Sequence, residues 1–211
     1  MIETAARTAE RAAVARGQGS RPTTPVALKE WAVVCHALLT GRQVVLVRKG
    51  GIHEARTGFR AEYDSFYLYP NTEHESLEQL QSAARPRLSP YGPPPQDTGT
   101  VLLPGYCHVV DVVPIDPESE PDRLRALEPL TIWSQPYFDL RLAYKPERPV
   151  YVLTLRAYCF PKPLAIPYLA AYGGCRSWVP LRTAVAAAPA EPALGDAAFQ
   201  AQRRAVLETL G

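Results

Sequence analysis

Prolines interrupt this chain so often that they restrict its fold more than any other feature of the sequence. The chain has 22 prolines among 211 residues, about twice the usual share of ~5%. Proline lacks a backbone donor and disrupts the interior of helices and central strands. We therefore expect short elements joined by many loops. The densest proline segment, residues 85–100 (RPRLSPYGPPPQDTGT), is predicted to be an exposed, disordered insertion.

Between the prolines, the spacing of apolar residues predicts a mixture of helices and strands. Leu28, Trp31, Cys35 and Leu38 recur at three- and four-residue steps, which predicts a helix over residues 26–39. β-branched or alternating runs predict strands, and the main ones are 43–48, 59–69, 101–113 and 150–160, with a last strand ending at 181. Further helices are predicted at 71–84, 121–127, 133–142 and 197–210. Because no βαβ rhythm appears, the expected class is α+β, with a mixed or antiparallel sheet and flanking helices.

The composition divides the chain into three parts. Residues 1–24 carry four arginines against two acids and are predicted to form a mobile N-terminal arm. Residues 25–183 are predicted to form a single α+β domain that contains the proline-rich insertion. Residues 184–211 turn to alanine and proline and end in a charged segment, which predicts a linker followed by a C-terminal helix.

Charge, hydropathy and cysteine spacing exclude several classes of protein. The formal net charge is only +2, so no field of the whole molecule argues for nucleic acid. No apolar run approaches ~18 residues, which predicts no membrane span, and the N-terminus lacks the apolar core of a secretory signal. The four cysteines form no C-x-x-C pair, so neither a zinc knuckle nor a redox motif is indicated. A cytoplasmic location is expected.

A basic glycine turn follows the strand predicted at 43–48. Residues 42–60 hold five basic residues and one acid, and the two glycines expose backbone N–H groups beside these cations. That combination suits a phosphate or a carboxylate. The alternative is a tight hairpin turn with solvated charges. The predicted phosphate-binding residues here are Arg48, Lys49, Gly50, Gly51, Arg56 and Arg60.

A second glycine-rich segment lies near the end of the predicted domain. It combines an aromatic ring, a cation and a hydroxyl with backbone that allows close approach, a mixture that suits a stacked base and its phosphate. Alternatively, Trp178 closes the core and the glycines only turn the chain. The predicted binding residues here are Tyr172, Gly173, Gly174, Arg176, Ser177 and Trp178, and Arg156 of the preceding strand is counted with them.

Acidic residues and a histidine cluster after the basic turn. Glu62, Asp64 and His74 are the candidate catalytic residues, because carboxylates and imidazole can hold Mg²⁺ or Mn²⁺ or act as acid and base. Lys49 precedes these acids, whereas restriction-type nucleases place the lysine two residues after an acid. The alternative is that acids and a histidine stabilise the start of a helix.

Four motifs resemble the family called domain of unknown function 1802. They are LKEWA at 28–32, RKGGI at 48–52, LYPNTEH at 68–74 and YGGCRSW at 172–178. The resemblance extends over residues 26–182 and implies no established activity, although some relatives are linked to Mrr-type restriction systems. Separately, ALLTGRQVVLVRK at 37–49 is similar to the opening of ASCH and PUA-like barrels, which bind RNA or modified nucleotides. A barrel of that kind, or a partly open sheet, is the expected form of the fold.

The hypothesis that unites these features is a nucleic-acid-associated protein that binds or processes DNA in a restriction, defence or repair setting. DNA or RNA is the expected partner. One alternative is a metal-dependent nuclease or phosphohydrolase with Mg²⁺ or Mn²⁺ as cofactor. Another is a non-catalytic interaction module that binds a protein partner through the proline-rich insertion or the C-terminal helix.

Overall fold

The computed structural model describes residues 21–49, 63–73, 75–85, 91, 95–174, 176–186 and 188–211. The strands are β1 (Val26–Trp31), β2 (Val45–Arg48), β3 (Ser65–Asn71), β4 (Thr100–Ile115), β5 (Val150–Pro167), β6 (Trp178–Pro180) and β7 (Glu191–Pro192). The helices are α2 (Ala32–Leu39), α3 (Pro95–Thr98), α4 (Pro121–Arg125), α5 (Gln135–Ala143) and α6 (Asp196–Leu210). Short 3-10 turns occur at Leu77–Gln79, Glu128–Leu130 and Ala170–Tyr172. No helix within these ranges is long and apolar enough to cross a membrane.

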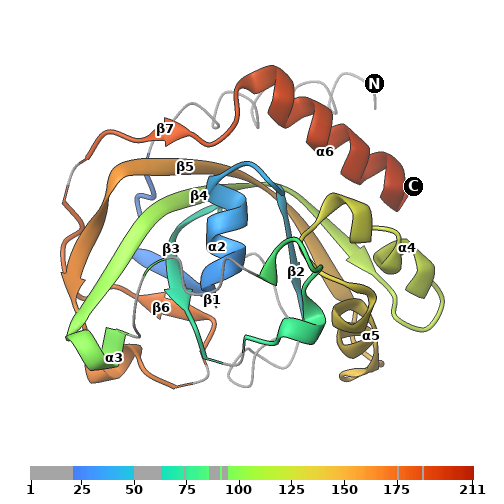
Figure 1. Ribbon diagram of the computed structural model, residues 1–211, viewed down its shortest axis with the longest axis horizontal. Coiled ribbons are helices and arrows are strands. Elements are labelled where there is room, and N and C mark those ends of the chain that lie inside the picture. Colours follow the sequence, from blue (N-terminus) through green and yellow to red (C-terminus); the bar gives the residue numbers. More distant parts are fainter. Residues whose placement is uncertain are drawn as a thin grey trace, which may run out of the picture.

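The strands form one mixed sheet in the order β2-β5-β4-β3-β1-β6, and β7 pairs with β5. β1 and β3 run parallel, whereas the other paired strands run antiparallel. The expected α+β class with a mixed sheet and flanking helices is confirmed. The sheet is open, with β2 and β6 at its two ends, and it curves around α2 (Figure 1).

One predicted helix is wrong in its first half, and a second is wrong over most of its length. Residues 26–31 form β1 rather than the first half of a helix, and only α2 is helical. β1 is hydrogen-bonded on both sides, to β3 and to β6, and is almost wholly buried, so it shows no alternation that would identify a strand. The helix predicted at 71–84 is reduced to the 3-10 turn Leu77–Gln79.

β4 and β5 form the longest ladder in the sheet, and the strands predicted there are confirmed but extend further. β5 continues to Pro167 although it contains several prolines. Leu103 pairs with Leu164 and Gly105 with Cys159, so four residues of β5 oppose one residue of β4. Pro161 and Pro163 lie in this irregularity, where the ladder does not require their missing donors.

Side chains alternate between the two faces of the sheet, and each face has its own core. In β3, Phe66 and Leu68 pack with α2 on one face. Tyr67 and Tyr69 point to the other face, where they pack with Tyr106. The second core is covered by partly buried residues of β5 and of the segments before and after β6, which are Leu164, Tyr168, Leu169, Val185, Ala188 and Ala190.

The C-terminal helix predicted at 197–210 is confirmed as α6, and two ion pairs attach it to the sheet. Arg203 places Nε and Nη2 each 2.7 Å from a carboxylate oxygen of Asp111 in β4. Arg156 of β5 donates from Nη2 to Asp196 at 2.6 Å. We call these four residues the α6 clasp. Apolar side chains of α6 also enter the core, namely Phe199, Val206 and Leu210.

Candidate functional site

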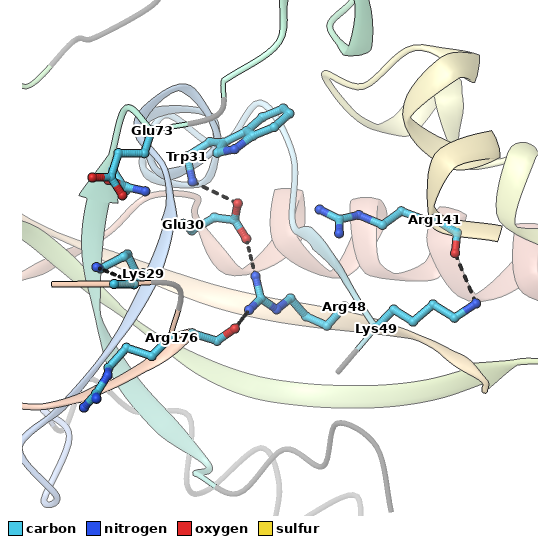
Figure 2. A pocket seen from close by; sticks show the side chains of 11 residues that line it. Lys29, Glu30, Trp31, Arg48, Lys49, Glu73, Arg141 and Arg176 are labelled. Carbon is cyan, nitrogen blue, oxygen red and sulfur yellow. Dashed lines mark hydrogen bonds and ion pairs between the residues drawn. The ribbon is translucent and has the colours of Figure 1, made fainter. Parts of the chain in front are cut away.

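A cavity of about 300 Å³ is lined by residues of β1, the ends of β2 and β3, α5 and the segment before β6. We call it the cationic pocket. Its lining residues are Lys29, Glu30, Trp31, Arg48, Lys49, Asn71, Glu73, Arg141, Gly174, Arg176 and Ser177. Five of these side chains are cationic and two are acidic. Figure 2 shows Arg48 at the centre, with Lys29 and Arg176 on one side and Lys49 and Arg141 on the other.

Arg48, the last residue of β2, connects the two ends of the sheet. Its Nη1 donates to Glu30 Oε2 of β1 at 2.9 Å, and its Nη2 donates to the hydroxyl of Ser177, which precedes β6. Glu30 Oε1 in turn accepts the backbone N–H of Trp31 at 2.9 Å. The side chains of Arg48 and Glu30 are only 14% and 8% exposed. A buried ion pair with these additional hydrogen bonds holds the guanidinium in one place.

Lys49 enters the pocket beside the C-terminus of α5. Its ammonium donates to the carbonyl oxygens of Arg141 at 3.2 Å and Leu142 at 3.4 Å. A cation is favoured at this position because the last carbonyls of a helix carry partial negative charge. Burial lowers the pKa of Lys49, and the charge of Glu147 opposes that shift. The two carbonyls orient the ammonium but leave its positive charge in place.

Lys29 of β1 holds the second glycine-rich segment against the sheet. Its Nζ donates to the carbonyl oxygens of Tyr172 at 2.7 Å and Gly174 at 3.1 Å. The same ammonium lies 5.4 Å from the centre of the Tyr69 ring, within the range of a cation–π contact. Gly174 has a φ of +79°, a conformation that favours glycine. Gly174, Arg176 and Ser177 of this segment line the cavity.

Arg141 and Arg176 complete the set of cations. The guanidinium of Arg141 lies 4.8 Å from the centre of the Tyr137 ring, and Arg176 is exposed. Within the described ranges, none of Lys49, Arg141 and Arg176 makes an ion pair. Three cations of the pocket therefore have no ion-pair partner in the part of the chain that the structure describes.

Glu75, in the segment of the helix predicted at 71–84, contacts α2 instead. Instead of starting its own helix, Glu75 accepts the backbone N–H of Val33 at 3.1 Å through Oε1 and so caps the N-terminus of α2. Burial raises the pKa of Glu75, and the backbone hydrogen bonds from Val33 and Ala32 oppose that shift. This carboxylate is part of the support of α2.

The structure brings residues from both predicted binding segments into one pocket. Arg48 and Lys49 come from the first segment, and Gly174, Arg176 and Ser177 come from the second. Their role in binding stays a prediction. Four further candidates, Gly50, Gly51, Arg56 and Arg60, lie outside the described residues.

Other predicted binding residues do not line the pocket. The hydroxyl of Tyr172 accepts the backbone N–H of Arg182 at 2.9 Å, and Gly173 belongs to the same turn. Trp178 packs edge-on against Tyr63 and Phe66, with ring centres 5.2 and 5.1 Å apart. Arg156 is buried in the α6 clasp.

Of the three predicted catalytic residues, only Asp64 is among the described residues, and it does not line the pocket. Glu62 and His74 lie outside the described residues. Asp64 is exposed and directly precedes β3, whereas the pocket residue Asn71 ends that strand. In the part of the chain that the structure describes, no group of three or more His, Cys, Asp or Glu side chains could hold a metal ion.

Several lining residues were not among the sequence-based candidates. Lys29, Glu30 and Trp31 belong to the LKEWA motif. Because the sequence predicts a helix there instead of β1, their position beside Arg48 and Lys49 was not expected. Asn71 follows in the LYPNTEH motif. Arg141 lies about ninety residues downstream of Lys49 on α5, and no sequence signal connects the two.

Comparisons with known proteins give one family and one group of structures. The family model described as "Domain of unknown function (DUF1802)" matches residues 27–205. The crystal structure of ASCH from Zymomonas mobilis is 13% identical, with a TM-score of 0.40, over 74% of this chain and 87% of that chain. A serine-to-alanine mutant of that protein is 12% identical, with a TM-score of 0.44, over 76% and 91%. No curated protein sequence matches the chain.

Proposed function

We propose that this chain, which belongs to the DUF1802 family, binds nucleic acid through phosphate groups that enter the cationic pocket. The observation that supports this most directly is the charge of the lining. Five cations and two acids give a net charge of +3 around one cavity, whereas the whole chain has a formal charge of +2. Guanidinium and ammonium groups are the usual protein partners of phosphate.

The uncharged lining residues favour a nucleotide over a bare anion. Trp31 lies in the same pocket as the cations, and its ring contacts Tyr137 edge-on at a centre-to-centre distance of 6.2 Å. A half-buried indole offers a base a surface for stacking. Asn71 and Ser177 add polar groups that can bond to a base or a sugar.

The volume of the pocket favours single-stranded nucleic acid. A cavity of about 300 Å³ is at the lower end of the range for ligand pockets. It has room for one nucleotide with its phosphate and no room for a duplex. A base must leave the stack to enter such a pocket, and this costs least in a single strand.

The experiment is a binding titration of the full chain with labelled single-stranded RNA, single-stranded DNA and duplex DNA. We expect the single strands to bind, with an affinity that falls steeply as salt rises. Arg176→Glu is expected to weaken binding by at least about tenfold, which is ~1.4 kcal/mol. The matched control is Arg204→Glu, at an exposed position of α6. Binding that both variants weaken equally would assign the affinity to general surface charge and contradict the proposal.

Processing of nucleic acid in a restriction, defence or repair setting stays a separate prediction. It requires cleavage in Mg²⁺ or Mn²⁺ that Asp64→Ala abolishes. The cytoplasmic location and a protein partner at the proline-rich insertion also stay predictions. Incubating the same labelled strands with each metal during the titration tests cleavage directly.

A further inference from the structure

We infer that the cationic pocket selects a terminal phosphate monoester of a nucleic-acid strand over the internal phosphodiesters. This inference rests on the proposed function and specifies its ligand. The end of a strand, rather than its continuous backbone, is then what the protein recognises.

The charge of the pocket matches a phosphate monoester better than a phosphodiester. An internal phosphodiester carries one negative charge, whereas a phosphate monoester carries about 1.5 to 2 near neutral pH. The lining has a net charge of +3, and Lys49, Arg141 and Arg176 lie outside any ion pair among the described residues. The additional charge of the monoester is favoured by each of these three cations. The gain is largest at Lys49, because that ammonium is buried and poorly screened by solvent.

The recessed cations of the pocket are more accessible to a terminal phosphate than to an internal one. Lys49 is 5% exposed, and the Arg48 side chain is 14% exposed, so a phosphate must enter the cavity to reach them. An internal phosphate is bonded to a sugar on each side, and both sugars must follow it into about 300 Å³. A terminal phosphate is bonded to one sugar and can enter first.

Arg48 closes one wall of the pocket. Its guanidinium bonds to Glu30 on one side and to Ser177 on the other, as Figure 2 shows for Arg48 and Glu30. A strand passing straight through between β2 and β6 would have to separate Arg48 from Ser177. The pocket therefore fits the end of a chain better than its middle.

The chemistry does not distinguish a 5′-phosphate from a 3′-phosphate, so the test includes both. The full chain is titrated with four single-stranded probes of one sequence. These carry a 5′-phosphate, a 3′-phosphate, hydroxyls at both ends, or no end because the strand is circular. At least one phosphate-ended probe is expected to bind about tenfold more tightly than the hydroxyl-ended probe, which is ~1.4 kcal/mol. The circular and hydroxyl-ended probes are expected to bind alike.

Two arginine variants test whether the preference for a phosphate end depends on the pocket. Arg176→Ala is expected to remove most of the preference for a phosphate end, and Arg204→Ala is expected to retain it. Both arginines are exposed, so neither change removes a buried contact, and matching thermal melting curves verify that both variants are folded.

The outcomes separate this inference from the proposed function. Equal binding of all four probes, lost in Arg176→Glu, overturns the terminal preference and leaves phosphate binding at the pocket intact. A preference that Arg176→Ala does not reduce overturns the assignment to this pocket. Failure of every probe to bind overturns the proposed function as well.

Discussion

The cationic pocket and the α6 clasp hold partly buried cations beside the same sheet but satisfy them differently. In the clasp, Arg203 lies 2.7 Å from Asp111, and Arg156 lies 2.6 Å from Asp196. In the pocket, Lys49 donates to two backbone carbonyls, and Arg141 lies over a tyrosine ring. Each arginine of the clasp has a carboxylate as its partner, whereas these two cations of the pocket have none among the residues that the structure describes.

The difference shows how a buried cation can be assigned a role. A carboxylate partner satisfies the donors and also neutralises the charge, so the pair contributes to the attachment of one element to another. A carbonyl or an aromatic ring directs the cation but leaves its charge. The first arrangement predicts an effect of mutation on stability, and the second predicts an effect on binding of an anion.

Arg48 combines both arrangements, because it lines the pocket and also has a carboxylate partner. Arg48→Ala is expected to lower the free energy of unfolding by about 3 kcal/mol, since Glu30 would remain buried without its ion pair. Urea denaturation measures this change. Adding Glu30→Gln in the same chain is expected to restore at least half of the loss. An unchanged urea midpoint in Arg48→Ala would show that the ion pair contributes nothing to stability.

Arg203→Ala tests the clasp. We expect the free energy of unfolding to fall by about 2 kcal/mol, less than for Arg48 because both side chains of this pair are more exposed, at 22% and 18%. Affinity for single-stranded nucleic acid is expected to stay the same in the folded variant. A loss of affinity equal to that of Arg176→Ala would erase the distinction between the two regions.

Lys49 is expected to make the affinity of the pocket for nucleic acid depend on pH. Burial lowers its pKa, so the ammonium loses its charge at a pH below the ordinary lysine value of about 10.4. Affinity is therefore expected to fall by several-fold, up to about tenfold, as pH rises through that lowered pKa. Lys49→Gln is expected to bind more weakly at neutral pH and to lose this dependence. Lys162→Gln, at an exposed position, is the control and should retain it.

Asp111 is expected to make the stability of the clasp depend on pH in the acid range, and this is the smallest effect that we predict. Burial alone would raise its pKa, but hydrogen bonds from Arg203 and Thr154 and the charge of Arg203 hold the pKa below its ordinary value. The stabilisation is complete above the unfolded pKa of about 3.9 and is lost as pH falls through the lower folded value. Acid unfolding followed by circular dichroism should show less of this acid-dependent loss in Arg203→Ala. Identical acid profiles would exclude Asp111 as its source.

The elements that sequence could predict are those whose pattern is local. β2 is a short β-branched run, and α6 has a helical spacing of apolar residues. β1 could not be identified in this way, because it is a strand only through its partners β3 and β6. Similarly, Glu75 turns inward to α2 rather than starting a helix, and that contact joins residues more than forty positions apart.

The candidate site was partly predictable for the same reason. The cations at 48 and 49 follow a recognisable strand and precede two glycines, so the sequence indicated an anion site there. Lys29 and Arg141 reach the pocket only through the order of the strands and the position of α5. Their contribution depends on tertiary packing, which single-sequence patterns do not contain.

The ring of strands in this protein is joined at one place by a side chain instead of a backbone ladder. No pairing links β2 to β6 among the described strands, and Arg48 bridges the interval. A chain in which a longer β2 paired with β6 would gain backbone hydrogen bonds and close the barrel. The added pairing would also fill the space between these two strands. The cavity therefore depends on incomplete closure of the sheet. Under the proposed function, sequence changes that complete the barrel are expected to abolish binding.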